Sequence, residues 1–218
     1  MTEPKSEVFN MDNMEFMRSC KDGQFDLAIV DPPYGIDASK GTWGCSNKGK
    51  VTNYGKKKWD KSKPPVEYFE QLFRISKNQI VWGANYFISL MPFDASCWIV
   101  WDKVNGDSNF ADCELAWTSF DSSVRKFSYT WNGMIQENMK NKEIRIHPTQ
   151  KPVALYTWLL QKYAKQGDSI LDTHLGSGSS RIACWDMKFD FTGIELDKEY
   201  FDASVKRFNT HKSQLKMF

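Results

Sequence analysis

The chain has 218 residues, of which 41% are hydrophobic and 26% charged, and its formal net charge is +2. This length suits one α/β domain, residues 1–218, with a full hydrophobic core. No apolar stretch approaches the roughly 20 residues that span a bilayer, and residues 1–10 carry no signal-peptide pattern. The composition therefore excludes a membrane-spanning chain, and the low net charge does not by itself indicate a nucleic-acid partner.

Cysteine and histidine are placed in a way that argues against a structural metal. The five cysteines are scattered without a C-x-x-C pair, and the three histidines are not spaced as zinc partners. We therefore expect a cytoplasmic protein in a reducing setting, with no metal site. Aromatic residues reach 15%, including nine Trp, which fits either a large aromatic core or surfaces that stack on bases.

In the N-terminal half, the short apolar run Phe25–Val30 ends at Asp31, and Pro32 and Pro33 stop it. This pattern predicts a buried strand followed by a turn. The long polar segment 36–65 has no apolar periodicity and is expected to be a mobile loop. Further on, the spacing predicts helices at 66–75 and 84–91, and strands at 79–82, 97–101, 115–119 and 126–131.

From Pro152 onward, helices and strands alternate. The sequence predicts a helix from Pro152 to Gly167 and strands at 169–173 and 189–194, with helices at 179–188 and 198–208. Strand and helix in short succession indicate a doubly wound, mostly parallel sheet.

A glycine turn follows the strand at 169–173. Gly176 and Gly178 precede a helix, and Glu195 lies 23 positions beyond Asp172, near the spacing expected for a carboxylate that binds ribose hydroxyls. The third glycine of the dinucleotide fingerprint is absent, since Arg181 stands there, which argues against a cofactor with a pyrophosphate. A glycine turn in a non-binding α/β protein remains the alternative.

The tetrapeptide Asp31-Pro32-Pro33-Tyr34 is the more specific signal, because ligands bind at the carboxyl ends of parallel strands. An exocyclic amine is a poor nucleophile until acceptors draw on its hydrogens. The Asp31 carboxylate and the Pro32 carbonyl, held by stiff proline φ angles, supply such acceptors, and Tyr34 offers a face for an extruded base. The alternative is a polar turn in which Asp31 only caps the chain.

Four segments in this order resemble the bacterial and phage amino-methyltransferases of DNA, in the permuted arrangement where the catalytic motif precedes the cofactor motif. They are Asp31–Gly35, His147–Pro152, Leu171–Ser179 and Gly193–Asp197. The resemblance implies a circularly permuted, seven-stranded Rossmann-like sheet. It also implies transfer of a methyl group from S-adenosylmethionine to the N6 amine of a flipped adenine in double-stranded DNA, at a specific site.

The resemblance also assigns residues. Asp31, Pro32, Pro33 and Tyr34 are the catalytic candidates. The cofactor candidates are Asp12, Asp31, His147, Thr149, Lys151, Asp172, Thr173, His174, Leu175, Gly176, Ser177, Gly178, Ser179, Glu195 and Leu196. Asp12 enters because the permutation requires a strand from the N-terminus, near 8–11, beside the strand that ends at Glu195; its alternative role is to cap a helix at 14–20. The family usually has Pro and Phe where this chain has Thr173 and His174.

The DNA candidates lie in two segments. Basic and aromatic residues of the 36–65 loop and two basic residues of a short target-recognition insert at 102–145 are of types that contact phosphates and bases. They are Lys40, Trp43, Lys48, Lys50, Tyr54, Lys56, Lys57, Lys58, Arg125 and Lys126. The alternative is that the loop is simply a solvated, flexible segment. The sequence leaves open whether the protein is a monomer or a homodimer.

Three rival functions stay open at this stage. Relatives that methylate RNA adenine or protein glutamine tend to carry Asn at position 31, and those that methylate cytosine N4 tend to carry Ser, whereas this chain has Asp31. An inactive DNA-binding relative is the third, although Tyr34, Gly176, Gly178 and Glu195 are all present. A restriction partner is a further possibility that the sequence does not decide.

Overall fold

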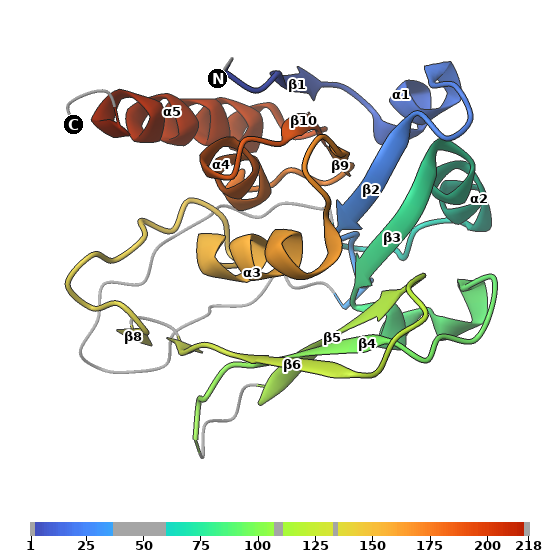
Figure 1. Ribbon diagram of the computed structural model, residues 1–218, viewed down its shortest axis with the longest axis horizontal. Helices are drawn as coiled ribbons and strands as arrows, with labels where there is room; N and C mark the ends of the chain where they lie inside the picture. The colour runs from blue at the N-terminus through green and yellow to red at the C-terminus, as the bar shows by residue number, and fades with distance from the viewer. Residues whose placement is uncertain (1–2, 37–59, 107–110, 133–134, 216–218) are drawn as a thin grey trace.

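The computed structural model describes residues 3–36, 60–106, 111–132 and 135–215, and Figure 1 traces their elements. The N-terminal half holds β1 (Ser6–Asn10), α1 (Asn13–Ser19), β2 (Phe25–Val30), α2 (Val66–Ile75) and β3 (Ser76–Trp82). Then come β4 (Trp98–Asp102), β5 (Cys113–Thr118), β6 (Arg125–Ser128), β7 (Trp131–Asn132) and β8 (Ile135–Gln136). The C-terminal part holds α3 (Val153–Tyr163), β9 (Ser169–Asp172), α4 (Ser179–Asp186), β10 (Asp190–Glu195) and α5 (Lys198–Leu215).

Eight of the described strands form one sheet in the order β1-β10-β9-β2-β3-β5-β4-β6. The five strands from β1 to β3 run parallel, whereas β5 is antiparallel to β3 and β4. The predicted doubly wound, mostly parallel sheet is confirmed, with one strand more than the seven expected. The parallel pairing of β6 with β4 gives the extra edge strand.

The N-terminal strand confirms the expected permutation. β1 pairs with β10 in parallel, with Asn10 opposite Glu195, so the sheet is completed from the opposite end of the chain. β7 and β8 form a separate two-stranded ribbon.

Side chains alternate between two hydrophobic cores because successive residues of a strand point to opposite faces. Leu27 and Ile29 of β2 belong to the core that also holds buried side chains of α3 and α4. Ala28 and Val30 belong to the core under α1 and α2. Helices therefore cover both faces of the sheet, with α3 and α4 on one side and α1 and α2 on the other (Figure 1).

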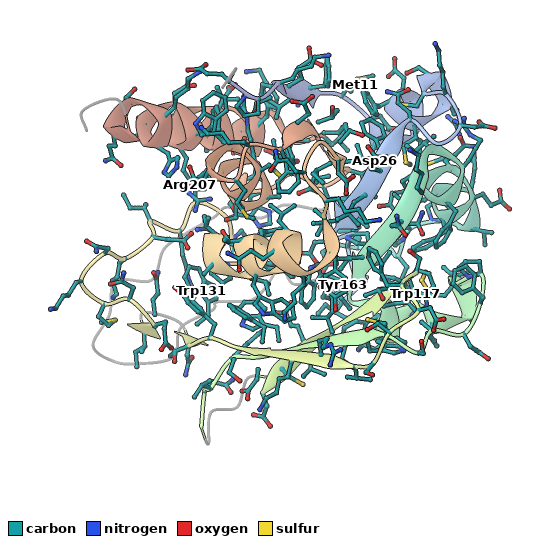
Figure 2. All side chains as sticks on the ribbon, in the orientation of Figure 1. Met11, Asp26, Trp117, Trp131, Tyr163 and Arg207 are labelled. Atoms are coloured by element: carbon teal, nitrogen blue, oxygen red, sulfur yellow. The ribbon has the colours of Figure 1, made fainter. Side chains whose placement is uncertain are left out.

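Many of the tryptophans are core residues. Trp82, Trp101 and Trp117 are at most 1% exposed, and Trp131 and Trp185 are also buried; Trp117 and Trp131 are labelled in Figure 2. For these five rings, the interpretation as an aromatic core is confirmed.

Several boundaries differ from the sequence prediction. The helix expected at 84–91 is instead two short 3-10 turns, Ala84–Tyr86 and Ile88–Leu90, because Gly83 before them is left-handed (φ 69°) and Phe87 between them leaves helical geometry (φ −143°). The helix expected to reach Gly167 ends at Tyr163. A turn follows there, in which the Lys165 N–H donates to Asp168. The strand expected at 126–131 ends at Ser128.

Two expected segments keep only part of their length within the described residues. Of the 36–65 loop, the structure describes Ile36 and residues 60–65. The prediction that this loop is mobile concerns residues 37–59, which lie outside the described residues. Of the 102–145 insert, β5 and β6 join the main sheet. Within the described part of the chain, no helix is long and apolar enough to cross a membrane.

Candidate active site

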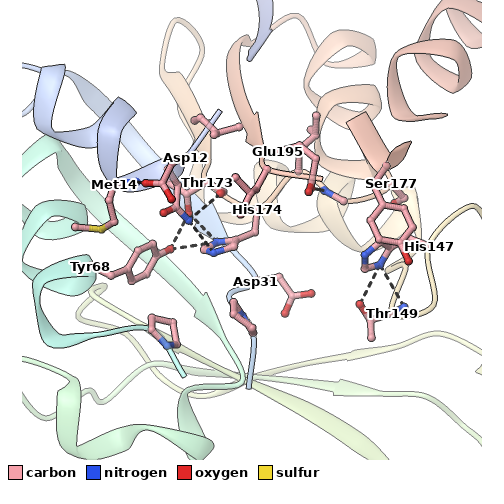
Figure 3. Close-up of a pocket in the computed structure, with 18 of the residues that line it drawn as sticks. Asp12, Met14, Asp31, Tyr68, His147, Thr149, Thr173, His174, Ser177 and Glu195 are labelled. Carbon is pink, nitrogen blue, oxygen red and sulfur yellow. Dashed lines mark hydrogen bonds between the residues drawn. The ribbon is translucent and has the colours of Figure 1, made fainter. Parts of the chain in front are cut away.

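The carboxyl ends of the five parallel strands meet at one edge of the sheet. Asp12, Glu195, Thr173, Asp31 and Gly83 each follow or end one of these strands. Between β9 and β2 the connecting helices switch from one face to the other, and such a switch opens a crevice that binds ligands. A cavity of about 330 Å³ lies there (Figure 3).

Many of the residues predicted from the sequence line this cavity. They are Asp12, Asp31, Pro33, His147, Thr149, Lys151, Thr173, His174, Leu175, Gly176, Ser177, Glu195 and Leu196. The cavity wall also includes side chains that the sequence reasoning missed, among them Asn13, Lys63, Tyr68, Tyr156 and Tyr200.

Glu195 is held by backbone amides at one end of the cavity. Its carboxylate accepts from the N–H of Gly176 and of Asp197, both at 2.8 Å, while burial raises its pKa. Leu196 next to it is 69% exposed, which leaves an apolar surface open at the cavity. This end thus combines fixed carboxylate and apolar groups.

Asp12 caps a helix and also lies at the cavity. Its side chain accepts from the N–H groups of Met14 and Glu15 and thereby caps α1. It also lines the cavity, at the end of the first parallel strand.

Three cofactor candidates do not line the cavity. Asp172 is buried and accepts from the Ser180 hydroxyl at 2.6 Å and from the His174 N–H at 3.0 Å; burial raises the pKa of its carboxyl to about 7. Gly178 is the N-cap of α4, in the left-handed region at φ 72°, and Ser179 is the first residue of that helix. These residues shape the glycine loop from behind the cavity wall.

Thr173 and His174, where the chain departs from the family pattern, form a polar cluster with Asn13 and Tyr68. Figure 3 labels Tyr68, Thr173 and His174 of this cluster. The Asn13 amide donates to His174 Nε2 at 2.9 Å, which leaves the ring proton on Nδ1, 3.0 Å from the Thr173 hydroxyl. That hydroxyl lies 2.7 Å from the Tyr68 hydroxyl. Burial lowers the pKa of His174 to about 4, so the ring is neutral at pH 7. Tyr68 belongs to the buried face of α2, and no sequence pattern marked it as a site residue.

His147 also reaches the cavity as a neutral ring. Burial, with the Lys151 charge adding to it, lowers its pKa to about 3. Its Nδ1 lies 3.1 Å from the Thr149 hydroxyl, and its ring packs edge-on against Tyr200 with centroids 4.3 Å apart.

At the other end of the cavity, Asp31 binds two donors from different parts of the chain. The Tyr34 hydroxyl donates to Oδ1 at 2.6 Å, and the Lys151 ammonium donates to Oδ2 at 2.7 Å. Burial raises the pKa of Asp31, and the Lys151 charge opposes that rise. The carboxylate is therefore fixed in orientation.

The Tyr34 ring packs against the backbone of Gly83 and stacks on Tyr86, with ring centroids 5.0 Å apart and planes 15° apart. A Cβ on Gly83 would lie 2.0 Å from the Tyr34 ring, so the close approach requires glycine. In this arrangement Pro33 reaches the cavity, Pro32 is buried and Tyr34 stands behind the wall.

Lys151, which the resemblance assigned to the cofactor, lies between two carboxylates. Its Nζ is 2.7 Å from Asp31 and 2.8 Å from Glu114 of β5, and its side chain is only 3% exposed. Glu114 in turn pairs with Lys103 at 2.6 Å. The sequence reasoning missed Glu114, because strand alternation alone does not separate a surface carboxylate from a buried one.

The residues predicted to contact DNA fall into two groups, one outside the described residues and one on strand β6. Lys40, Trp43, Lys48, Lys50, Tyr54, Lys56, Lys57 and Lys58 lie outside the described residues. Arg125 and Lys126 lie on the edge strand β6, where Lys126 pairs with Asp102 at 3.2 Å, and neither lines the cavity. No group of three His, Cys, Asp or Glu side chains suited to a metal ion occurs among the described residues.

Comparison with known proteins supports a DNA methyltransferase. The family model described as DNA methylase matches residues 116–206. The chain is 24% identical to the Type II methyltransferase M.HpaI of Haemophilus parainfluenzae over 233 residues, which cover 89% of this chain and 71% of that protein. It is 26% identical to the Type II methyltransferase M2.DpnII of Streptococcus pneumoniae over 254 residues, which cover 95% of this chain and 92% of that protein.

Solved structures share the fold. The M1.HpyAVI–SAM complex superposes with a TM-score of 0.63 at 19% identity, covering 93% of this chain and 98% of that one. The PvuII DNA methyltransferase, which is cytosine-N4-specific, gives a TM-score of 0.61 at 14% identity and covers 95% and 87%.

The fold and the crevice at its switch point are those of a ligand-binding doubly wound α/β protein. The predicted resemblance to the bacterial DNA methyltransferases is confirmed by the family model and by the Type II relatives. The expected cofactor agrees with the solved complex that contains it.

Proposed function

We propose that this protein transfers a methyl group from S-adenosylmethionine to the N6 amine of adenine in double-stranded DNA. The observation that carries the proposal is the position of Asp31. Its carboxylate lines the cavity in the first turn after β2, and Glu195 lines the same cavity two strands away, where β10 stops. The Asp31 carboxylate suits an amine substrate, and the Glu195 carboxylate suits a nucleoside cofactor.

The cofactor end fits the chemistry of an adenosyl group. Glu195 offers a fixed carboxylate for ribose hydroxyls, the exposed Leu196 offers an apolar face for a purine ring, and Asp12 offers a polar acceptor beside it. His147, Thr149 and the glycine loop would surround the methionine portion. When bound, S-adenosylmethionine supplies an electrophilic methyl group on a positively charged sulfur.

The residues around Asp31 prepare the amine. The Asp31 carboxylate accepts one amine hydrogen and the Pro32 carbonyl the other, which frees the nitrogen lone pair. With the cofactor bound, the nitrogen would form its bond to the methyl carbon as the methyl–sulfur bond breaks, the bonding pair would stay on sulfur, and one amine proton would leave to solvent. Most of the acceleration comes from holding the amine in line with the methyl group.

We assign the DNA contacts by chemical type. The lysines of the 36–65 loop neutralise phosphates, which gives affinity without sequence reading. Because β5 and β6 of the 102–145 insert are part of the sheet, we place target recognition mainly in the segment from β7 to Arg145. Its exposed Lys140, Asn141 and Lys142 are of types that contact DNA.

Transfer of labelled methyl groups tests the proposal. The protein is incubated with S-adenosylmethionine and, in parallel, with duplex DNA, RNA and protein, and the labelled DNA is digested to nucleosides. We expect label in N6-methyladenine. Label in N4-methylcytosine, or in RNA or protein alone, would contradict the proposal, and no label in any substrate would favour a DNA-binding relative without activity.

A further inference from the structure

Lys151 is the most deeply buried cation beside the candidate catalytic carboxylate. Its Nζ donates to Asp31 at 2.7 Å and to the Tyr34 hydroxyl at 3.4 Å. It also forms an ion pair with Glu114 at 2.8 Å. The ammonium group is therefore in contact with three protein groups.

This arrangement matters because Asp31 can accept from an amine only while it is ionised. Removing a carboxylate from water favours its neutral form, and an opposite charge within about 4–6 Å favours the charged form. Lys151 is the cation that contacts Asp31, and Glu114 holds Lys151 from the far side.

We propose that Lys151 is a positioning residue that keeps Asp31 ionised and aims its carboxylate at the substrate amine, with Glu114 as the anchor of Lys151. The proposal rests on the function proposed above for Asp31. It departs from the role in cofactor binding that the resemblance implies for Lys151.

Several other ionisable groups lie near Asp31 and Lys151, and their charges also affect the protonation of Asp31. They are Tyr34 after β2, Tyr68 on α2, Lys103 after β4, Glu114 on β5, Tyr156 on α3 and Asp172 on β9. Lys103 pairs with Glu114, whereas Lys151 is the cation that contacts Asp31 among the residues that the structure describes.

Two substitutions should shift the pH dependence of kcat in opposite directions, which separates this role from a merely structural one. Lys151→Met removes the positive charge, so the pKa of Asp31 rises and the acid limb of the kcat profile moves to higher pH by about 1–3 units. Glu114→Gln removes a negative charge that raises the pKa of Asp31, so the acid limb moves to lower pH. Loss of packing alone would not move the limb in opposite directions in the two variants.

A matched control uses a lysine–aspartate pair of the same length away from the cavity. Lys77 binds Asp26 at 2.7 Å, and its side chain is 62% exposed. Lys77→Met is expected to leave the pH profile unchanged. Calorimetric binding of S-adenosylmethionine to Lys151→Met shows whether the variant is folded, and we expect its affinity to fall less than threefold.

Carboxyl carbon NMR provides a readout independent of activity. The Asp31 signal, assigned with Asp31→Asn, should titrate at higher pH in Lys151→Met and at lower pH in Glu114→Gln than in the unsubstituted protein. An unchanged Asp31 titration in Lys151→Met, or an upward shift in Glu114→Gln, overturns the inference. If the unsubstituted protein methylates no DNA, the proposed function fails, and the NMR titration still decides the role of Lys151.

Discussion

Replacing Gly83 by alanine tests how the Tyr34 ring is supported beside Asp31. Gly83 follows β3 with φ +69°, and a Cβ there would meet three atoms of the Tyr34 ring at 2.0–2.4 Å. The ring must therefore move, and its hydroxyl would lose the 2.6 Å hydrogen bond to Asp31.

The expected magnitude has two parts. A left-handed backbone costs a non-glycine residue about 1–2 kcal/mol, and a hydrogen bond to a charged group contributes about 1.5–3 kcal/mol. Gly83→Ala should thus lower the free energy of unfolding by about 2.5–5 kcal/mol. For a chain of this size, each kcal/mol lowers Tm by about 2–4 °C.

Gly23→Ala is the matched control, because Gly23 has φ +61° and a Cβ added there would meet no atom within 4 Å. Gly23→Ala is therefore expected to show the free-energy cost of a left-handed alanine without any contact with Tyr34. Thermal unfolding and methyl-transfer rates of both variants separate the two parts. We expect a loss of kcat of about tenfold or more in Gly83→Ala, since each 1.36 kcal/mol of the barrier is tenfold in rate, and little change in Gly23→Ala. Equal stability losses, or full activity in Gly83→Ala, would refute the account of Tyr34.

Three further predictions concern charge. The pKa of Asp172 is about 7 in the folded state, against an ordinary value of 3.8. Between these values the folded state holds an extra proton, so the contribution of Asp172 to the free energy of unfolding falls as pH rises. In denaturant titrations, Asp172→Asn should remove up to about 1.4 kcal/mol per pH unit of this pH dependence. Replacing Lys56, Lys57 and Lys58 by Ala should make the log–log salt slope of DNA binding shallower by about 0.9 for each phosphate that the variant no longer neutralises, and an unchanged slope would show that these lysines are only solvated. Asp31→Ala should abolish turnover while calorimetry still detects cofactor binding, and full activity would remove Asp31 from the mechanism.

The bounds of an element could be predicted best where regular apolar spacing coincides with a proline or glycine at either end of the element. α2 begins and ends at the predicted residues, Val66 and Ile75, because its apolar spacing is regular and prolines precede it. The helix predicted at 84–91 was wrong, since the apolar spacing does not reveal that Phe87 leaves helical geometry in the middle of this segment.

For the site, the strand ends were predictable because parallel strands bring their carboxyl ends to one edge. The contacts among side chains were not. Lys151 and Asp31 are 120 positions apart, and Glu114 comes from an antiparallel strand whose place in the sheet no local pattern specifies. The polar cluster of His174 and Tyr68 depends in the same way on a contact between α2 and the turn that follows β9.

The most direct test of the central claim is methylation-aware sequencing of unmethylated duplex DNA exposed to the protein and S-adenosylmethionine, with Asp31→Ala in parallel. We predict N6-methyladenine at one short recurring sequence, and none in the Asp31→Ala sample. N4-methylcytosine in place of N6-methyladenine, or equal methylation by the Asp31→Ala protein, would contradict the account.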